Sequence, residues 1–154
     1  MISFPIIRVV TKLLIPYILL FGLYVQFHGD FGPGGGFQAG VIIASAIVLY
    51  AMVFGLPAAQ KVAPPWVIEK LVALGLLIYA GTGFASLFLP RPNQDVPVNG
   101  NFLEYAVLRH NVWPGVIPTD QHLGIFLVEL GVGITVTAVM IIIFYAFAGR
   151  RRVA

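Results

Sequence analysis

Hydrophobic residues make up 59% of this 154-residue chain and charged residues only 10%, with a mean hydropathy of +0.95. A water-soluble domain needs more polar surface than this, so the composition predicts an integral membrane protein. The net charge of +3 is too small to indicate nucleic acid as a partner. The absence of cysteine excludes disulfides, thiol catalysis and cysteine-ligated metals.

Four apolar segments are long enough to cross the hydrocarbon core of a bilayer, which is about 30 Å thick. We expect helices over residues 5–27, 36–56, 66–89 and 122–148. The apolar part of the first is short, but Arg8 and Lys12 can extend their charged ends to the interface. The sequence therefore predicts one all-α membrane domain over residues 1–154, with four transmembrane helices.

The basic residues are divided unequally between the two sides of this membrane domain. Seven fall on the side that holds both ends of the chain, namely Arg8, Lys12, Lys61, Lys70, Arg150, Arg151 and Arg152. Only Arg91 and Arg109 fall on the other side. Because cytoplasmic segments are enriched in Lys and Arg, we expect a multi-pass protein of the cell membrane with both termini in the cytoplasm.

A glycine-rich loop connects the first two spans and reads His-Gly-Asp-Phe-Gly-Pro-Gly-Gly-Gly-Phe-Gln over residues 28–38. Glycine reaches positive φ without steric cost and proline fixes its own φ, so a tight, re-entrant connection is expected. Its central motif is Pro33, Gly34, Gly35, Gly36 and Phe37. The loop lacks the Lys-Ser/Thr pair of a phosphate-binding loop, and no βαβ unit surrounds it to support dinucleotide binding.

Two polar residues of this loop leave its role open. His28 and Asp30 lie two residues apart, so they could hydrogen-bond each other or relay a proton. Histidine is the side chain whose unperturbed pKa lies nearest neutrality. The other interpretation is a purely structural turn, since Pro-Gly clusters are the usual connection between helices.

Glu129 is the strongest single-residue signal in the sequence. It lies about 10 Å along the last predicted span, between leucine, valine and phenylalanine residues. An acidic side chain there costs a few kcal/mol and normally faces a partner helix, a cation or water. Two interpretations remain open: ion handling, or a hydrogen-bonded carboxyl that joins two helices.

Small residues mark faces on which helices could pack closely. They are Gly36, Gly40 and Ala44 on the second span, Gly75, Gly81, Gly83 and Ala85 on the third, and Gly131 and Gly133 on the fourth. We expect each set to contact another helix, either within the chain or in another subunit.

The segment between the last two spans contains no recognisable reaction centre. Its polar residues are Asp95, Glu104, Arg109, His110, Asn111 and Asp120, scattered without metal-ligand spacing. No nucleophile triad, His-Glu-x-x-His or paired-carboxylate motif is present. We therefore expect no cofactor, no metal and no enzymatic activity, and interpret the segment as a solvated loop with subunit contacts.

Two stretches resemble the MnhB/MrpB family, whose members are small subunits of the multisubunit Mrp-type Na+/H+ antiporters. One is the string from Phe27 to Gly40, which is similar to the family's glycine-rich signature; the other is the last span around Glu129. The family usually has glycine before the histidine, where this chain has Phe27. It often has aspartate where this chain has Glu129.

The resemblance implies an accessory membrane subunit of a cation (Na+)/proton antiporter complex, supporting assembly and lining or tuning the ion path. Its partners would be the other subunits, the lipid bilayer, and the Na+ and H+ that the complex transports. One acidic residue deep in the spans is too little for a complete antiport path, which agrees with an accessory role. The alternatives are the equivalent subunit of a membrane-bound hydrogenase or respiratory complex, and a self-sufficient small oligomeric transporter.

Overall fold

The computed structural model describes residues 5–29, 35–90, 99–104, 107 and 122–149. Its helices are α1 (Pro5–His28), α2 (Gly36–Phe54), α3 (Leu56–Val62), α4 (Pro65–Phe88) and α6 (His122–Ala148). All but α3 contain a stretch long and apolar enough to cross a membrane. The prediction of an all-α membrane protein with four transmembrane helices is therefore confirmed.

Glycine and proline set the helix boundaries at one end of the molecule. Gly55 ends α2 two residues before the predicted limit, because it adopts a φ of +92° that side-chain-bearing residues rarely take. Its N–H donates to the carbonyl of Ala51 at 2.9 Å. Pro57 then lies in the first turn of α3, and Pro65 begins α4, where the missing N–H of proline has no helical partner to lose.

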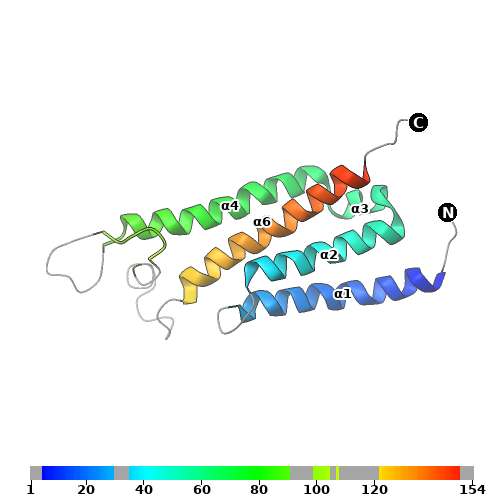
Figure 1. The fold of residues 1–154 in the computed structure, drawn as a ribbon, viewed down its shortest axis with the longest axis horizontal. Coiled ribbons are helices and arrows are strands. Elements are labelled where there is room, and N and C mark those ends of the chain that lie inside the picture. Colours follow the sequence, from blue (N-terminus) through cyan, green and yellow to red (C-terminus); the bar gives the residue numbers. More distant parts are fainter. Residues whose placement is uncertain (1–4, 30–34, 91–98, 105–106, 108–121, 150–154) are drawn as a thin grey trace.

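The four long helices lie side by side in the order α4, α6, α2, α1 (Figure 1). Helix α6 packs against α4 on one side and α2 on the other, whereas α1 packs on α2 and hardly touches α6. The start of α1, the end of α6 and α3 all lie at one end of the molecule (Figure 1). The predicted location of this end in the cytoplasm stays a prediction.

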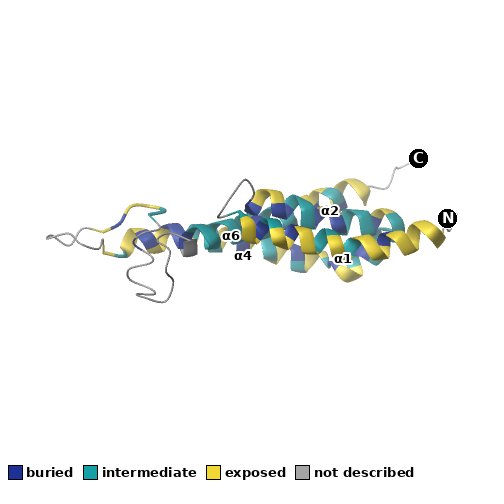
Figure 2. Ribbon diagram, turned by 90° about the horizontal axis from the view of Figure 1, so that it is seen from below, coloured by how far each residue is buried: buried dark blue, intermediate teal, exposed yellow. Residues whose placement is uncertain are grey.

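Large apolar side chains cover much of the surface, and α1 is the least buried of the four long helices (Figure 2). In water such a surface would aggregate, whereas lipid tails or neighbouring subunits cover it at no such cost. The exposure of α1 therefore fits a membrane environment.

Glycines allow α6 to approach both of its neighbours at backbone distance. A Cβ added to Gly131 would lie 2.8 Å from the carbonyl oxygen of Gly75 and 2.9 Å from the nitrogen of Tyr79, both on α4. A Cβ on Gly40 of α2 would lie 2.8 Å from the carbonyl oxygen of Gly133. Contacts this short exclude any side chain, so the expected close packing at these glycines is confirmed.

The prediction was wrong for part of α4. Gly81 has nothing within 4 Å of its Cβ position, and Ala85 is exposed, so both lie on the outer side of that helix. Gly83 is buried, but it receives the ring of Phe102 rather than a helix. Composition marks a helix as able to pack closely, but it does not show which of its small residues face inward.

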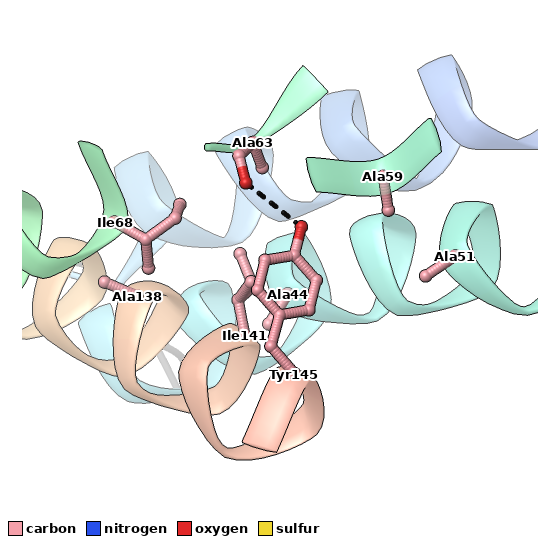
Figure 3. Close-up of a cluster of buried hydrophobic side chains, with 8 residues drawn as sticks. All are labelled: Ala44, Ala51, Ala59, Ala63, Ile68, Ala138, Ile141 and Tyr145. Atoms are coloured by element: carbon pink, nitrogen blue, oxygen red, sulfur yellow. Dashed lines mark hydrogen bonds between the residues drawn. The ribbon is translucent and has the colours of Figure 1, made fainter. Parts of the chain in front are cut away.

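A second contact region lies near the end of the molecule that carries α3 (Figure 3). Its buried residues come from α2, α3, α4 and α6 and are Ala44, Ala51, Ala59, Ala63, Ile68, Ala138, Ile141 and Tyr145. The Tyr145 hydroxyl donates to the carbonyl of Ala63 at 3.1 Å, which ties α6 to the end of α3. Alanine predominates here because short side chains let four helices converge.

We predict that Gly131→Ala destabilises the protein and that Gly81→Ala does not. The added methyl group at position 131 meets backbone atoms of α4, which cannot rotate away, so the cost should be about 1–3 kcal/mol. At position 81 the methyl group meets nothing, and alanine is the better helix former. Thermal unfolding of the two purified variants in one detergent measures the difference, and equal midpoints would contradict the packing described for α6.

Membrane orientation is tested with single cysteines, since the chain has none of its own. Lys61 on α3 and Asn99, which pairs with Pro90 just after α4, are exposed beyond opposite ends of α4, whereas Ala59, two residues before Lys61, is fully buried and unsuitable. In intact cells a membrane-impermeant maleimide should label Asn99→Cys but not Lys61→Cys, and inside-out vesicles should reverse the result. Labelling of both positions from the same side would overturn the four-span topology.

Candidate functional site

The carboxyl group of Glu129 on α6 lies against both ends of the glycine-rich loop. A Cβ on Gly29, directly after α1, would lie 2.5 Å from Oε2 of Glu129. A Cβ on Gly35, directly before α2, would lie 2.9 Å from Oε1 of the same carboxyl. The structure thus brings together two features that are far apart in the sequence, the loop and the acidic residue of the last helix.

The two ends of the loop also lie against each other. The Cβ position of Gly29 is 2.5 Å from Cα and 2.7 Å from the nitrogen of Gly35, so any side chain at Gly29 would collide with the backbone. Gly35 adopts a φ of +113°, which favours glycine strongly. The expected close backbone approach is therefore confirmed at these two positions, as is a positive φ at Gly35. Asp30, Pro33 and Gly34 lie outside the described residues.

Glu129 is seven residues from the start of α6, but it lies level with the last turn of α1 and the first turn of α2. Seven residues correspond to about 10 Å of helix, so α6 begins well beyond the point where α1 ends (Figure 1). Contacts continue along the same face, since a Cβ on Gly36 would collide with the carbonyl of Glu129. The site therefore lies at the end of the α2–α6 interface where α2 begins, and Oε2 of Glu129 is buried there.

Gln26 of α1 is a buried polar residue that did not stand out in the sequence. It is only 5% exposed, and its Oε1 lies against Gly133, one helical turn from Glu129 along α6. Its Nε2 has no hydrogen-bond partner among the described residues. A signal was present in the sequence: an amide between Val25 and Phe27 in an apolar helix, four residues after Gly22, which is also buried.

His28 and Phe37 do not share the position of Glu129. The His28 side chain is exposed and stacks on Tyr24, with ring centroids 5.4 Å apart. Phe37 is 61% exposed, although its neighbours Gly35 and Gly36 are buried. Among the described residues no group of three or more His, Asp or Glu side chains is placed to hold a metal ion.

The arrangement defines a multi-pass membrane protein in which a glycine-rich loop packs on a carboxyl group inside a transmembrane helix. Residues 6–142 match the family described as a domain related to the MnhB subunit of Na+/H+ antiporter, and the chain belongs to this MnhB family.

Relatives of known name are similar to the chain over most of its length. A Na+/H+ antiporter subunit of Alkalihalophilus pseudofirmus is 33% identical over 134 residues, covering 85% of this chain and 88% of that protein. The mnhB2 protein of Staphylococcus epidermidis is 30% identical, covering 95% of each chain, and that of Staphylococcus haemolyticus is 31% identical, covering 94% of each.

We predict that Gly35→Ala impairs the site more than Gly55→Ala does. Both glycines have positive φ, so alanine pays a conformational penalty of about 1–2 kcal/mol at either position. Only at Gly35 does the new methyl group also meet the carboxyl of Glu129, whereas at Gly55 the nearest atom is a carbon of Pro57 at 3.8 Å.

Thermal stability and the amount of assembled complex should therefore fall further for Gly35→Ala. Matching losses in the two variants would mean that only backbone conformation matters at position 35. In that case the contact with Glu129 would contribute nothing measurable to stability or assembly.

Proposed function

We propose that this chain is an accessory membrane subunit of a multisubunit Na+/H+ antiporter and that Glu129 is its ion-handling group. Membership of the MnhB family and the name of the Alkalihalophilus pseudofirmus relative support the first part. The observation that carries the second part is the placement of the Glu129 carboxyl between Gly29 and Gly35.

This placement gives the carboxyl group a direct way to affect the loop. A carboxylate and a carboxylic acid differ by a full charge and by one hydrogen-bond donor. Because Gly29 and Gly35 have no side chains, the backbone at these two positions is in direct contact with the carboxyl group and is affected by its change in charge. Uptake of a proton or a cation at Glu129 would thus change how the loop packs, and with it the surface that the loop presents to a neighbouring subunit.

His28 and Asp30 extend this proposal to the loop itself. His28 is exposed at the end of α1, where a partner subunit can reach its imidazole ring. Asp30 lies two residues further along the chain. In this scheme the loop motif positions the two ends of the connection, and Glu129 senses or passes the ion.

An accessory role, rather than independent transport, is supported by how few acidic groups the described spans contain. Within the described transmembrane helices the acidic residues are Glu69, exposed near the start of α4, and Glu129. A proton-coupled path normally uses several such groups in series. The remaining groups would come from other subunits, and the complex as a whole would carry Na+ and H+.

The decisive variant is Glu129→Gln in the assembled complex. Glutamine keeps the size and hydrogen-bonding capacity of glutamate and removes its titration. We expect normal assembly with antiport activity reduced at least tenfold, or with a shifted pH profile, in inverted membrane vesicles. Glu129→Asp, which retains a titratable carboxyl group, should preserve much of the activity.

Full activity of Glu129→Gln at every pH, with assembly lost only in Glu129→Leu, would show that the residue is a hydrogen-bonding link between helices. Liposomes containing this chain alone provide the control for the accessory role. Sodium movement driven by a pH gradient in those liposomes would establish a self-sufficient transporter instead.

A further inference from the structure

Two exposed cations of α1 lie over one aromatic ring of α2. The guanidinium carbon of Arg8 and the ammonium nitrogen of Lys12 are each 5.7 Å from the centre of the Phe54 ring. Stacking of Tyr50 on Phe54, with centroids 4.7 Å apart, helps to hold that ring in place. Both cations are exposed, and no described carboxylate pairs with either of them.

Such a pair is well suited to bind an anion. Arg8 and Lys12 are one helical turn apart on α1, where like charges repel each other, and a cation–π contact at an exposed site contributes only about 0.5–1 kcal/mol to each. One phosphate group bridging the two cations would remove the repulsion. The acidic residue Glu69 cannot do so, because it lies on α4 at the opposite edge of the molecule from α1.

An apolar groove lies further along α1 and α2, where these helices meet α4 and α6. It has a volume of about 220 Å³ and is lined by Leu23, Gln26, Ile43, Leu71, Leu130, Gly133, Ile134 and Thr137. Only two of these residues, Gln26 and Thr137, have polar side chains. The groove is therefore suited to a hydrocarbon chain rather than to a hydrated ion.

The cation pair and the groove lie in line. Lys12 and Leu23 on α1 are eleven residues apart, as are Phe54 and Ile43 on α2. Eleven residues are close to three helical turns, so each pair lies on one side of its helix, about 16 Å apart along the axis. One leaflet of the hydrocarbon core has nearly this thickness, about 15 Å.

We propose that this face of α1 and α2 binds an anionic phospholipid. Arg8 and Lys12 hold the phosphate over Phe54, and an acyl chain runs along α1 and α2 into the groove at Leu23 and Ile43. The cation pair is remote from Glu129, although the groove extends to Leu130 and Gly133 on α6, and the proposal does not depend on the proposed transport role.

Binding is measured on the full chain in detergent by native mass spectrometry, with phosphatidylglycerol and phosphatidylcholine of identical acyl chains as probes. The wild-type chain should retain phosphatidylglycerol preferentially. The double variant R8Q/K12Q should lose about thirtyfold in affinity, the usual effect of two basic residues at an anionic membrane surface. The matched control, K61Q/K70Q, removes two charges at the same end of the molecule and should bind normally.

The groove is tested separately with Leu23→Trp, which fills it from an exposed position, and Leu20→Trp, another exposed position on α1, as its control. Only Leu23→Trp should weaken phosphatidylglycerol binding. Folding of all variants is checked by helicity, and R8K/K12R, which keeps both charges, should bind as the wild type does.

Three results would overturn the proposal. Equal losses in R8Q/K12Q and K61Q/K70Q would mean diffuse attraction to anionic lipid. Displacement of the lipid by inorganic phosphate at equal concentration would mean a site for a soluble anion. Cross-linking of Lys12 to an acidic segment of another subunit in the intact complex, with no lipid retained, would mean a protein contact.

Discussion

The close approach of α6 to two neighbours at once is the constraint on which the rest of the structure depends. Gly131 and Gly133 are two residues apart, which corresponds to about 200° around a helix. They therefore face opposite sides, Gly131 toward Gly75 of α4 and Gly133 toward Gly36 of α2 and Gln26 of α1. In lipid there is no hydrophobic force between helices, so association relies on van der Waals contact and hydrogen bonds over such close surfaces. Thr137 adds one of these bonds, to the carbonyl of Gly40 at 3.2 Å.

The same interface positions the candidate site. Glu129 and Gly133 are one helical turn apart and share a face of α6. The face of α6 that packs on α2 therefore carries the carboxyl group at the end nearest the glycine-rich loop. At Gly133 the space beside the helix is taken by the side chain of Gln26, whereas the Glu129 carboxyl reaches the two ends of the glycine-rich loop. Gly29 and Gly35 lack side chains where that group needs room. Deleting the loop would therefore disturb helix packing and the candidate site together. Removing only the charge of Glu129 tests the site while leaving the packing in place.

Much of the fold was predictable because membrane helices have a strong sequence signal. Length and hydropathy were enough to locate α1, α2, α4 and α6. The break at Gly55 was missed because a single glycine in an apolar run reveals its positive φ only in the structure. Gly81 was assigned to a packed face for a related reason: small residues occur on several sides of α4, and hydropathy does not distinguish these sides. The candidate site was only partly predictable, since about ninety residues separate Glu129 from the glycine-rich loop and no local rule sets the register of α6 against α2.

The arrangement of the helices bears on how an ion could pass. The order α4, α6, α2, α1, with α1 hardly touching α6, leaves each of these helices with a side that no other described helix covers. A polar path across a membrane has to be enclosed on every side, because exposed polar groups are costly in lipid. Glu129 lies between helices of this chain, but a path that continued from it would soon reach the edge of the layer. Closing such a path requires surfaces from neighbouring subunits. A carboxyl group at the loop end of the α2–α6 interface is therefore better placed to influence an ion path shared with a partner subunit than to form a path by itself.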